Sequence, residues 1–162
     1  MKVIIHDLDD NFHKMLEGKC DSIIRADGKY APCQGCFGCW TKHPARCFMK
    51  DSLMESCRTV GRGDPLIIIS RSCYGGYSPA VKNIIDRSIG ESTPFSTYRG
   101  GQMHHTLRYG KRKQLRVISY GEMTDREQET FRLLTERNRV NCGFETGEFT
   151  YVTDLSRLEE ML

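Results

Sequence analysis

Short apolar runs alternate along this chain with segments whose apolar residues recur at helical spacing. The continuously apolar run Leu66–Ser70 is typical of a strand that is covered on both faces. Val81, Ile84, Ile85 and Ile89 would share one face of a helix. The pattern predicts five strands, at residues 2–8, 21–26, 65–72, 114–120 and 147–153.

Helix-start patterns fall between these runs. Ser78 followed by Pro79 is a good N-cap and first-turn pair. Three further pairs have capping-box spacing: Ser52 with Glu55, Thr124 with Glu127, and Ser156 with Glu159. Strands that alternate with helices predict an α/β fold with a parallel sheet covered on both faces, and a single domain over residues 1–162. The last helical segment, LSRLEEML, is short, so we expect one face to be thinly covered unless a second subunit packs there.

Two irregular stretches, residues 27–50 and 89–113, are long for a compact domain. In an open parallel sheet, ligands bind beyond the carboxyl ends of the strands. Residues 27–50 follow the second predicted strand and SRSCYGGYSP follows the third. We therefore expect both segments to open onto the same edge of the sheet.

Charge and composition exclude several classes of protein. The net charge of +3, from 24 basic and 21 acidic residues, is too small to indicate a nucleic-acid-binding protein. The N-terminal apolar run is too short for a signal peptide or a membrane span, which predicts a cytoplasmic protein without a membrane association. Thiols stay reduced in the cytoplasm, so a disulfide framework is the least favoured use of the eight cysteines.

Four of these cysteines lie close together in CQGCFGCWTKHPARC, at Cys33, Cys36, Cys39 and Cys47. Their spacing favours an iron–sulfur cluster over zinc, because structural zinc prefers two well-separated pairs. Metal-free thiols that pack as small apolar side chains are an almost equal alternative, and redox-active thiols are a third. Among the scattered cysteines, we expect Cys20, Cys57 and Cys142 in the core and Cys73 near any ligand.

The loop after the third predicted strand is the best candidate for a ligand site. Gly75 and Gly76 would let the backbone approach a ligand, and Tyr74 and Tyr77 offer flat faces to an aromatic ring. A flavin would suit this site, and an ordinary strand-to-helix turn is the alternative interpretation. The residues expected to bind the cofactor are Ser72, Cys73, Tyr74, Gly75, Gly76, Tyr77 and Ser78, with Tyr120 and Gly121 after the fourth strand.

The order Tyr74, Gly75, Gly76, Ser78, Lys82, Asp86, Arg87 resembles the flavin-binding loop of the flavodoxin-like NAD(P)H-dependent FMN reductase family. The four-cysteine motif resembles the iron–sulfur flavoprotein branch of that family. The resemblance covers roughly residues 30–90. It implies a three-layer flavodoxin-like fold whose five-stranded parallel sheet has the order 2-1-3-4-5, with bound FMN and a four-iron four-sulfur cluster on the four cysteines.

The implied function is an FMN-dependent oxidoreductase that takes electrons from NAD(P)H and passes them to a small molecule, a protein or the cluster. The resemblance also implies a homo-oligomer. Two alternatives stay open: a non-enzymatic electron carrier and a flavin-free scaffold subunit.

Two segments depart from the family pattern. Arg71, Ser72 and Cys73 replace the usual proline and small apolar residue before the tyrosine. The first loop, HDLDDNFHKM, has no glycine, and its aspartates would repel a phosphate by about 1 kcal/mol per contact in water and about 4 at an intermediate dielectric. Asp10 is expected to cap a helix over residues 11–18.

These departures leave three hypotheses for the FMN phosphate. Residues 89–113 could hold it through their basic side chains, a neighbouring subunit could supply the same loop, or the chain could have lost the flavin. The basic side chains are Arg99, His104, His105 and Arg108.

Overall fold

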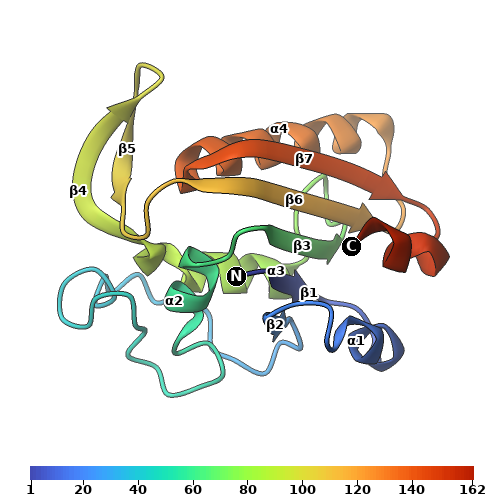
Figure 1. Cartoon of the computed structure of the whole chain (residues 1–162), viewed down its shortest axis with the longest axis horizontal. Helices are drawn as coiled ribbons and strands as arrows, with labels where there is room; N and C mark the ends of the chain where they lie inside the picture. The colour runs from blue at the N-terminus through green and yellow to red at the C-terminus, as the bar shows by residue number, and fades with distance from the viewer.

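The computed structural model describes residues 1–162 and shows an open parallel β-sheet. Its strands lie in the order β2-β1-β3-β6-β7, and every neighbouring pair is parallel (Figure 1). Counted along the chain, this is the predicted order 2-1-3-4-5. The strands are β1 (Val3–His6), β2 (Ser22–Arg25), β3 (Leu66–Arg71), β6 (Arg112–Tyr120) and β7 (Phe144–Val152).

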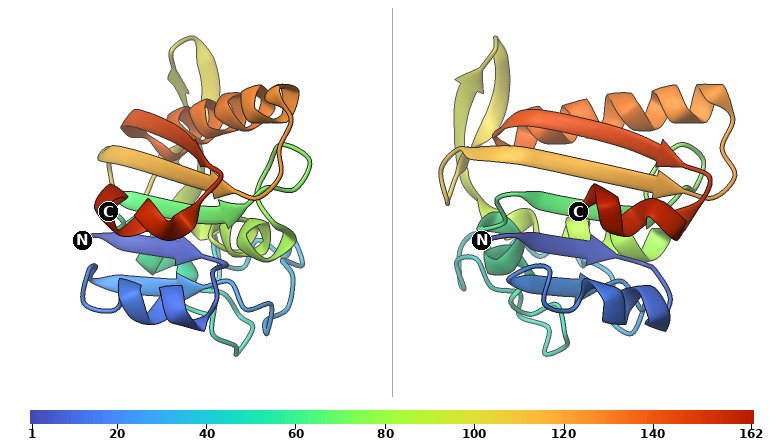
Figure 2. Two further views of the ribbon diagram at one scale, coloured as in Figure 1. Left: turned by 90° about the vertical axis from the view of Figure 1, so that its right-hand side faces the viewer. Right: turned by 45° about the vertical axis from the view of Figure 1, so that its right-hand side comes forward.

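Helical segments cover both faces of the sheet, which gives the predicted three layers (Figure 2). Because side chains alternate along a strand, Val3 and Ile5 face one layer and Ile4 faces the other. The first layer contains α2 (Ser56–Gly61), α3 (Pro79–Arg87) and α4 (Asp125–Cys142). The second contains α1 (Asp10–Leu16) and the 3-10 helix η2 (Leu155–Met161).

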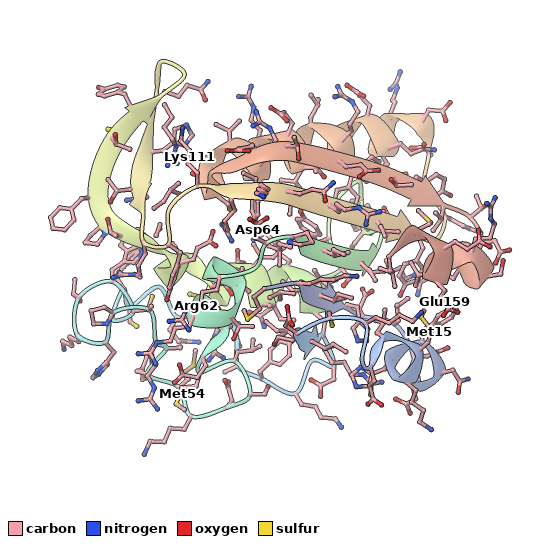
Figure 3. All side chains as sticks on the ribbon, in the orientation of Figure 1. Met15, Met54, Arg62, Asp64, Lys111 and Glu159 are labelled. Carbon is pink, nitrogen blue, oxygen red and sulfur yellow. The ribbon has the colours of Figure 1, made fainter.

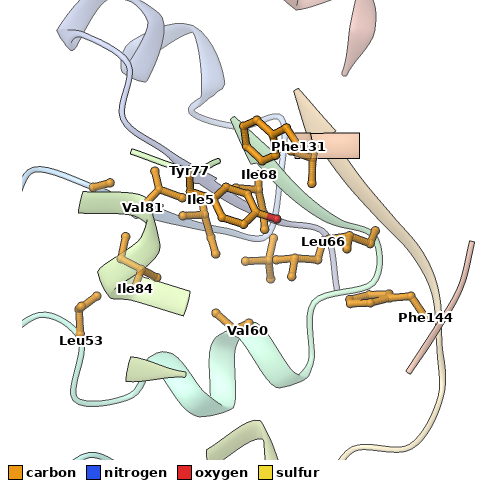
Figure 4. Close-up of a cluster of buried hydrophobic side chains, with 14 of the residues drawn as sticks. Ile5, Leu53, Val60, Leu66, Ile68, Tyr77, Val81, Ile84, Phe131 and Phe144 are labelled. Carbon is orange, nitrogen blue, oxygen red and sulfur yellow. The ribbon is translucent and has the colours of Figure 1, made fainter. Parts of the chain in front are cut away.

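The larger core lies between the sheet and helices α2, α3 and α4 (Figure 4). Ile68 of β3 packs there with Val81 and Ile84 of α3, at the helical spacing seen in the sequence. Tyr77 meets Phe131 of α4 edge-to-face, with ring centroids 4.9 Å apart. Each buried aliphatic or aromatic side chain of this kind stabilises the fold by about 1.5–3 kcal/mol.

The smaller core lies under α1 and η2. Leu16 of α1 and Leu158 of η2 pack on the isoleucines of the sheet that point to this side: Ile4, Ile67, Ile69 and Ile118. The C-terminal segment is only seven residues long, as predicted. Coverage of this face by a second subunit stays a prediction.

Two of the predicted helix starts are confirmed. The Ser78 hydroxyl accepts a hydrogen bond from the Val81 amide at 3.4 Å, at the start of α3. Thr124 and Glu127 form a complete capping box at the start of α4.

Three predicted helix starts are wrong. Helix α2 begins at Ser56, so Ser52 does not cap it. Asp154 instead of Ser156 caps η2, because its carboxylate accepts from the Ser156 amide at 2.8 Å. Asp9 instead of Asp10 caps α1 and accepts from two amides, those of Asn11 at 3.0 Å and Phe12 at 3.1 Å.

Residues 92–107 form a β-hairpin that stands away from the central sheet, where the sequence analysis expected an irregular loop (Figure 1). It consists of β4 (Ser92–Arg99) and β5 (Gln102–Leu107), and the 3-10 helix η1 (Ile89–Glu91) precedes it. Gly100 and Gly101 both have positive φ, as a two-residue hairpin turn requires. Phe95, Tyr98 and Met103 are 73%, 76% and 66% exposed on this arm.

Buried polar groups join the hairpin base to the sheet. The Arg112 guanidinium donates to the Val60 carbonyl at 2.7 Å and the Cys142 carbonyl at 2.8 Å, and it pairs with Glu91 at 2.9 Å. Asp64, labelled in Figure 3, accepts from the amides of residues 113 and 114 at 3.0 and 3.2 Å. The start of β6 is therefore fixed to α2, η1 and the end of α4.

Arg87 closes the long loop that carries the clustered cysteines. Its buried guanidinium donates to both Asp51 oxygens, at 2.6 and 2.8 Å, and to the Ala31 carbonyl at 2.9 Å. The Ala31 amide also donates to Asp51 at 3.2 Å. The guanidinium lowers the pKa of Asp51, so the carboxylate is charged at neutral pH. This ion pair therefore fastens both ends of residues 31–51 to the end of α3.

A buried histidine pair lies at the end of β1. His6 has no exposed surface, and its Nδ1 accepts from the Leu8 amide at 3.1 Å. Its Nε2 must then carry the proton of the neutral ring and donate to His13 Nδ1, 2.9 Å away. Burial, followed by the neighbouring His13, lowers the pKa of His6 to about 4.

We expect this histidine to make the protein less stable in mild acid. In the unfolded chain His6 binds a proton near pH 6.5, but in the folded protein it does so only near pH 4. The unfolded state therefore binds more protons in this window, and stability falls as the pH falls through it. Between pH 6.5 and 5 the loss from His6 alone is about 2 kcal/mol. Urea unfolding at both values would measure it.

The matched comparison is His6→Gln, which should remove most of this pH dependence. His43→Gln changes an exposed histidine and should leave it unchanged. An unaltered pH dependence in His6→Gln would contradict the assignment.

We expect Asp51→Ala to destabilise the protein by about 3–5 kcal/mol, because it leaves the Arg87 guanidinium buried without its counter-ion. Glu129→Ala removes an exposed ion pair with Arg132 and should cost less than about 1 kcal/mol. Urea denaturation at pH 7 measures both free energies of unfolding. Equal, small losses in the two variants would show that the Arg87 pair does not hold the loop.

Candidate functional site

The carboxyl edge of the sheet carries the tight turn that follows β3. The Cys73 amide donates to the Gly76 carbonyl and the Gly76 amide donates to the Cys73 carbonyl, both at 3.0 Å. Tyr74 and Gly75, between them, have φ of 51° and 72°. This is the left-handed region, which glycine adopts freely and tyrosine rarely. The turn thus presents the Tyr74 side chain outward, 91% exposed.

The other side chains of this turn are used by the fold. Tyr77 is buried, its hydroxyl accepts from Asn138 at 3.0 Å, and burial raises its pKa. Ser78 caps α3, and its amide donates to the Ser70 hydroxyl at 2.9 Å. Of the two tyrosine faces considered for a flavin ring, only that of Tyr74 is free.

The two glycines of the turn have different roles. A Cβ on Gly75 would lie 2.9 Å from the Glu127 carbonyl oxygen, so this glycine lets the turn approach the start of α4. A Cβ on Gly76 would meet nothing closer than 3.6 Å. At Gly75 the close approach is therefore a contact within the protein, between the turn and α4. At Gly76 an added Cβ would make only ordinary van der Waals contacts.

The first loop places a carboxylate where the ends of β1, β3 and β6 meet. Both Asp7 oxygens accept from the Arg71 amide, at 3.0 and 3.1 Å, and one accepts from the Tyr120 hydroxyl at 3.1 Å. Burial, together with the Asp7 charge, raises the pKa of Tyr120. The adjacent Gly121 carbonyl accepts from Tyr151 at 2.9 Å. The Arg71 amide and the Tyr120 hydroxyl are therefore already hydrogen-bonded to the Asp7 carboxylate.

A cleft of about 790 Å³ opens beside Asp7 and is predominantly acidic. Asp10 in it pairs with Arg25, which lowers the pKa of Asp10. The charged residues in its wall are Asp7, Asp9, Asp10, Asp27, Arg25 and Lys29. With four acidic and two basic side chains, the cleft does not fit a phosphate dianion.

A second cavity, of about 520 Å³, lies between the cysteine loop, α3 and the C-terminal half of α4. This places the cysteine loop toward the amino edge of the sheet, where α3 and α4 end. The expectation that the loop shares an edge with the β3 turn is therefore wrong.

Trp40 anchors the cysteine loop. Its indole N–H donates to the Ile89 carbonyl at 2.9 Å, and the centroid of its ring lies 4.4 Å from that of the His105 ring. The loop thus packs on η1 and the hairpin.

The four clustered cysteines all line the second cavity but differ in exposure. Cys33 and Cys36 are exposed, Cys39 and Cys47 are half-buried, and all eight cysteines of the chain are free. No three histidine, cysteine, aspartate or glutamate side chains converge on a point that could hold a metal ion. The structure therefore gives no support to the four-iron four-sulfur cluster that the spacing suggested, and that ligand set stays a prediction.

Cys39 instead meets Cys57 of α2 beside Gly90. A Cβ on Gly90 would lie 2.8 Å from Cys57 Sγ and 2.9 Å from Cys39 Cβ. The pairing with the Cys57 thiol, aided by the positive charge of Arg108, lowers the pKa of Cys39 to about 7, and the same pairing raises that of Cys57. Cys57 is buried as predicted, but nothing in the sequence indicated its partner.

The basic residues of 89–113 bind protein groups away from the first loop. Arg99 donates to the Asn141 carbonyl at 2.9 Å, and Arg108 donates to the Gly90 carbonyl at 3.0 Å. His104 Nδ1 lies 3.2 Å from the Asn141 side-chain oxygen. Within one chain they lie at the opposite edge from Asp7, so they cannot hold a phosphate there.

No protein-family model matches this sequence, and no curated protein does. Solved structures match the fold over nearly the whole chain. Smu.1420 from Streptococcus mutans UA159 matches with a TM-score of 0.55 and 12% identity, over 97% of this chain and 89% of its own.

Two flavin or nicotinamide enzymes match similarly. An FMN-dependent NADH-azoreductase from Bacillus anthracis, solved with FMN, has a TM-score of 0.55 and 14% identity, over 99% of this chain and 93% of its own. An NAD(P)H:quinone oxidoreductase from Methanothermobacter marburgensis has a TM-score of 0.53 and 14% identity, over 99% and 92%. No helix of this chain is long and apolar enough to cross a membrane. At these identities the matches establish a shared flavodoxin-like α/β fold.

Proposed function

We propose that this protein is a flavin-dependent oxidoreductase that accepts electrons from NAD(P)H. The observation that carries the proposal is the turn after β3, which presents an exposed Tyr74 ring at the carboxyl edge of the sheet, beside a half-buried Gly76. Ligands of open parallel sheets bind at this edge. The azoreductase with the same fold was solved with FMN, which supports a flavin here.

In this proposal the chain positions the flavin ring and leaves the redox chemistry to it. Tyr74 stacks on the ring, Gly76 leaves room for its edge, and the loop at Gly121 borders it. The flavin, when bound, supplies two-electron transfer from a nicotinamide cofactor to an acceptor. In this proposal the acceptor is a small molecule such as a quinone or an azo compound, because the two enzymes that share the fold are named for these acceptors.

The phosphate end of FMN does not fit the first loop, because the Asp7 carboxylate occupies the meeting point of three strands. A ribityl phosphate at this edge is therefore repelled by the Asp7 charge. A partner subunit could supply cationic groups, which agrees with the predicted homo-oligomer. Its exposed arm residues Phe95 and Tyr98 are available for such a contact.

A flavin-free scaffold subunit is the second candidate, and the same carboxylate favours it. Asp7 gives the ends of β3 and β6 their hydrogen-bond partner without any ligand. A non-enzymatic electron carrier differs from the enzyme only in lacking NAD(P)H oxidation. Absorbance of the purified protein, flavin reconstitution and NAD(P)H oxidation separate the three.

We expect Tyr74→Ala to weaken flavin binding about two- to tenfold, because an aromatic stacking contact is worth about 0.5–1.5 kcal/mol. Phe48→Ala removes an exposed aromatic side chain of the loop at the amino edge and should change nothing. Quenching of flavin fluorescence on titration measures both affinities. Equal affinities in the two variants would place the ring elsewhere, and no binding by wild type would leave the scaffold.

We expect Asp7→Asn to strengthen FMN binding relative to riboflavin by about fivefold or more. Removing one charge near the phosphate relieves at least about 1 kcal/mol of repulsion, and the amide oxygen can still accept from Arg71. Asp21→Asn, at the amino end of β2, is the control and should not alter the ratio. An unchanged ratio in Asp7→Asn would show that the phosphate does not approach the first loop.

A further inference from the structure

The cavity under the cysteine loop extends from the amino-edge ends of α3 and α4 to the buried Tyr77, and its lining differs from that of the exposed β3 turn. Five cysteines reach it, Cys33, Cys36, Cys39, Cys47 and Cys142, among apolar residues that include Phe37, Phe48, Met49, Ile85 and Leu134. A volume of about 520 Å³ suits a small organic molecule. The lining thus favours a compact, largely apolar ligand that reacts with thiols.

One cysteine of this wall has a second thiol directly behind it. Cys39 is half-buried and lines the cavity, whereas Cys57 has no exposed surface and does not line it. The two side chains meet over Gly90, where a Cβ would lie within 3.0 Å of both. Any other residue at Gly90 would push the two cysteines apart.

Both thiols are held in place by neighbouring backbone. The Cys57 thiol donates to the Arg87 carbonyl at 3.2 Å. The Cys39 carbonyl accepts from the Ala45 amide at 2.9 Å, and the adjacent Trp40 is hydrogen-bonded to Ile89. The pair therefore has an accessible member and a sheltered one in a fixed arrangement.

We propose that Cys39 and Cys57 are the attacking and resolving thiols of a thiol–disulfide exchange site, and that its substrate is a small apolar disulfide bound in this cavity. This site is independent of the flavin. Exposure assigns the roles, since only Cys39 can meet a substrate in the cavity and only Cys57 lies behind it.

The reaction proceeds in two exchanges that balance. Cys39, having lost its proton to solvent, attacks one substrate sulfur; the substrate S–S bond breaks, a mixed disulfide forms on Cys39, and the first thiolate takes a proton from solvent. Cys57 then attacks Cys39 Sγ, the mixed disulfide breaks, and the second thiol leaves with the Cys57 proton. The substrate gains two electrons and two protons, and a Cys39–Cys57 disulfide remains. A small dithiol reductant then reduces the Cys39–Cys57 disulfide by two further exchanges; the dithiol is oxidised to its own disulfide, and both protein thiols are restored.

The test treats the reduced full-length protein with one equivalent of 4,4′-dithiodipyridine, a neutral aromatic disulfide whose released thione is coloured. Remaining thiols are then blocked with N-ethylmaleimide, and the peptides are mapped without reduction. We expect two thiones per reagent molecule and a Cys39–Cys57 linkage as the main product. Cys33→Ser, which changes an exposed cysteine of the same loop, should give the same result.

Two variants separate the roles. Cys57→Ser should release only one thione and retain the pyridylthio adduct on Cys39. Cys39→Ser should leave Cys57 unmodified over the same time, because it is sheltered. Circular dichroism checks that each variant is folded, and Cys57→Ala replaces Cys57→Ser if the buried hydroxyl prevents folding.

A Cys33–Cys36 linkage with both Cys39 and Cys57 blocked by N-ethylmaleimide in wild type would overturn the proposal. Two thiones from folded Cys57→Ser, or an adduct on Cys33 or Cys36 in place of Cys39, would overturn it as well. Because wild-type mapping decides the linkage alone, the result does not depend on how well the variants fold.

Discussion

The ion pair between Arg87 and Asp51 is the constraint on which the amino-edge half of this protein depends. Residues 31–51 have no regular secondary structure and no sheet partner, so their position follows from where their ends are fastened. The buried guanidinium fastens both ends to α3. Burying charge is expensive, so each member of the pair requires the other: a loop that moved Asp51 away would leave the Arg87 charge buried without a partner. The cavity, the Trp40 anchor and the meeting of Cys39 with Cys57 all follow from that arrangement.

The two edges of the sheet differ in the side chains that they carry. The carboxyl edge, where the fold ordinarily places a ligand, is acidic and internally paired through Asp7. The amino edge carries buried arginines and thiols around a cavity. A shared fold therefore fixes where strands end without fixing the chemistry there, which side chains decide.

The strands of the sheet could be predicted from the sequence because each one shows in the pattern of its own residues. The continuous run at Leu66–Ser70 and the spaced residues Val81 and Ile84 each identify their element, and right-handed crossovers leave few orders for five parallel strands. The hairpin was missed although Gly100 and Gly101 could have indicated it, because polar residues at 92–107 obscure the alternation.

The candidate sites were harder to predict, because they depend on contacts between distant parts of the chain. Spacing among Cys33, Cys36, Cys39 and Cys47 suggested a shared ligand, yet spacing along a loop does not say which way each side chain turns. The partner of Cys39 lies in a helix that the motif does not include. Likewise, the role of Gly75 depends on α4, about fifty residues further along the chain.

Gly90 gives the hairpin arm a mechanical relation to the interior. Only Ser88 and the three residues of η1 separate the end of α3 from β4, and Gly90, the middle residue of η1, lies against the side chains of both Cys39 and Cys57. Arg108, at the other end of the arm, is bonded to the carbonyl of the same glycine. The base of the arm therefore packs directly on the thiol pair. A displacement of the arm that moves Gly90 also changes the positions of Cys39 and Cys57 relative to each other.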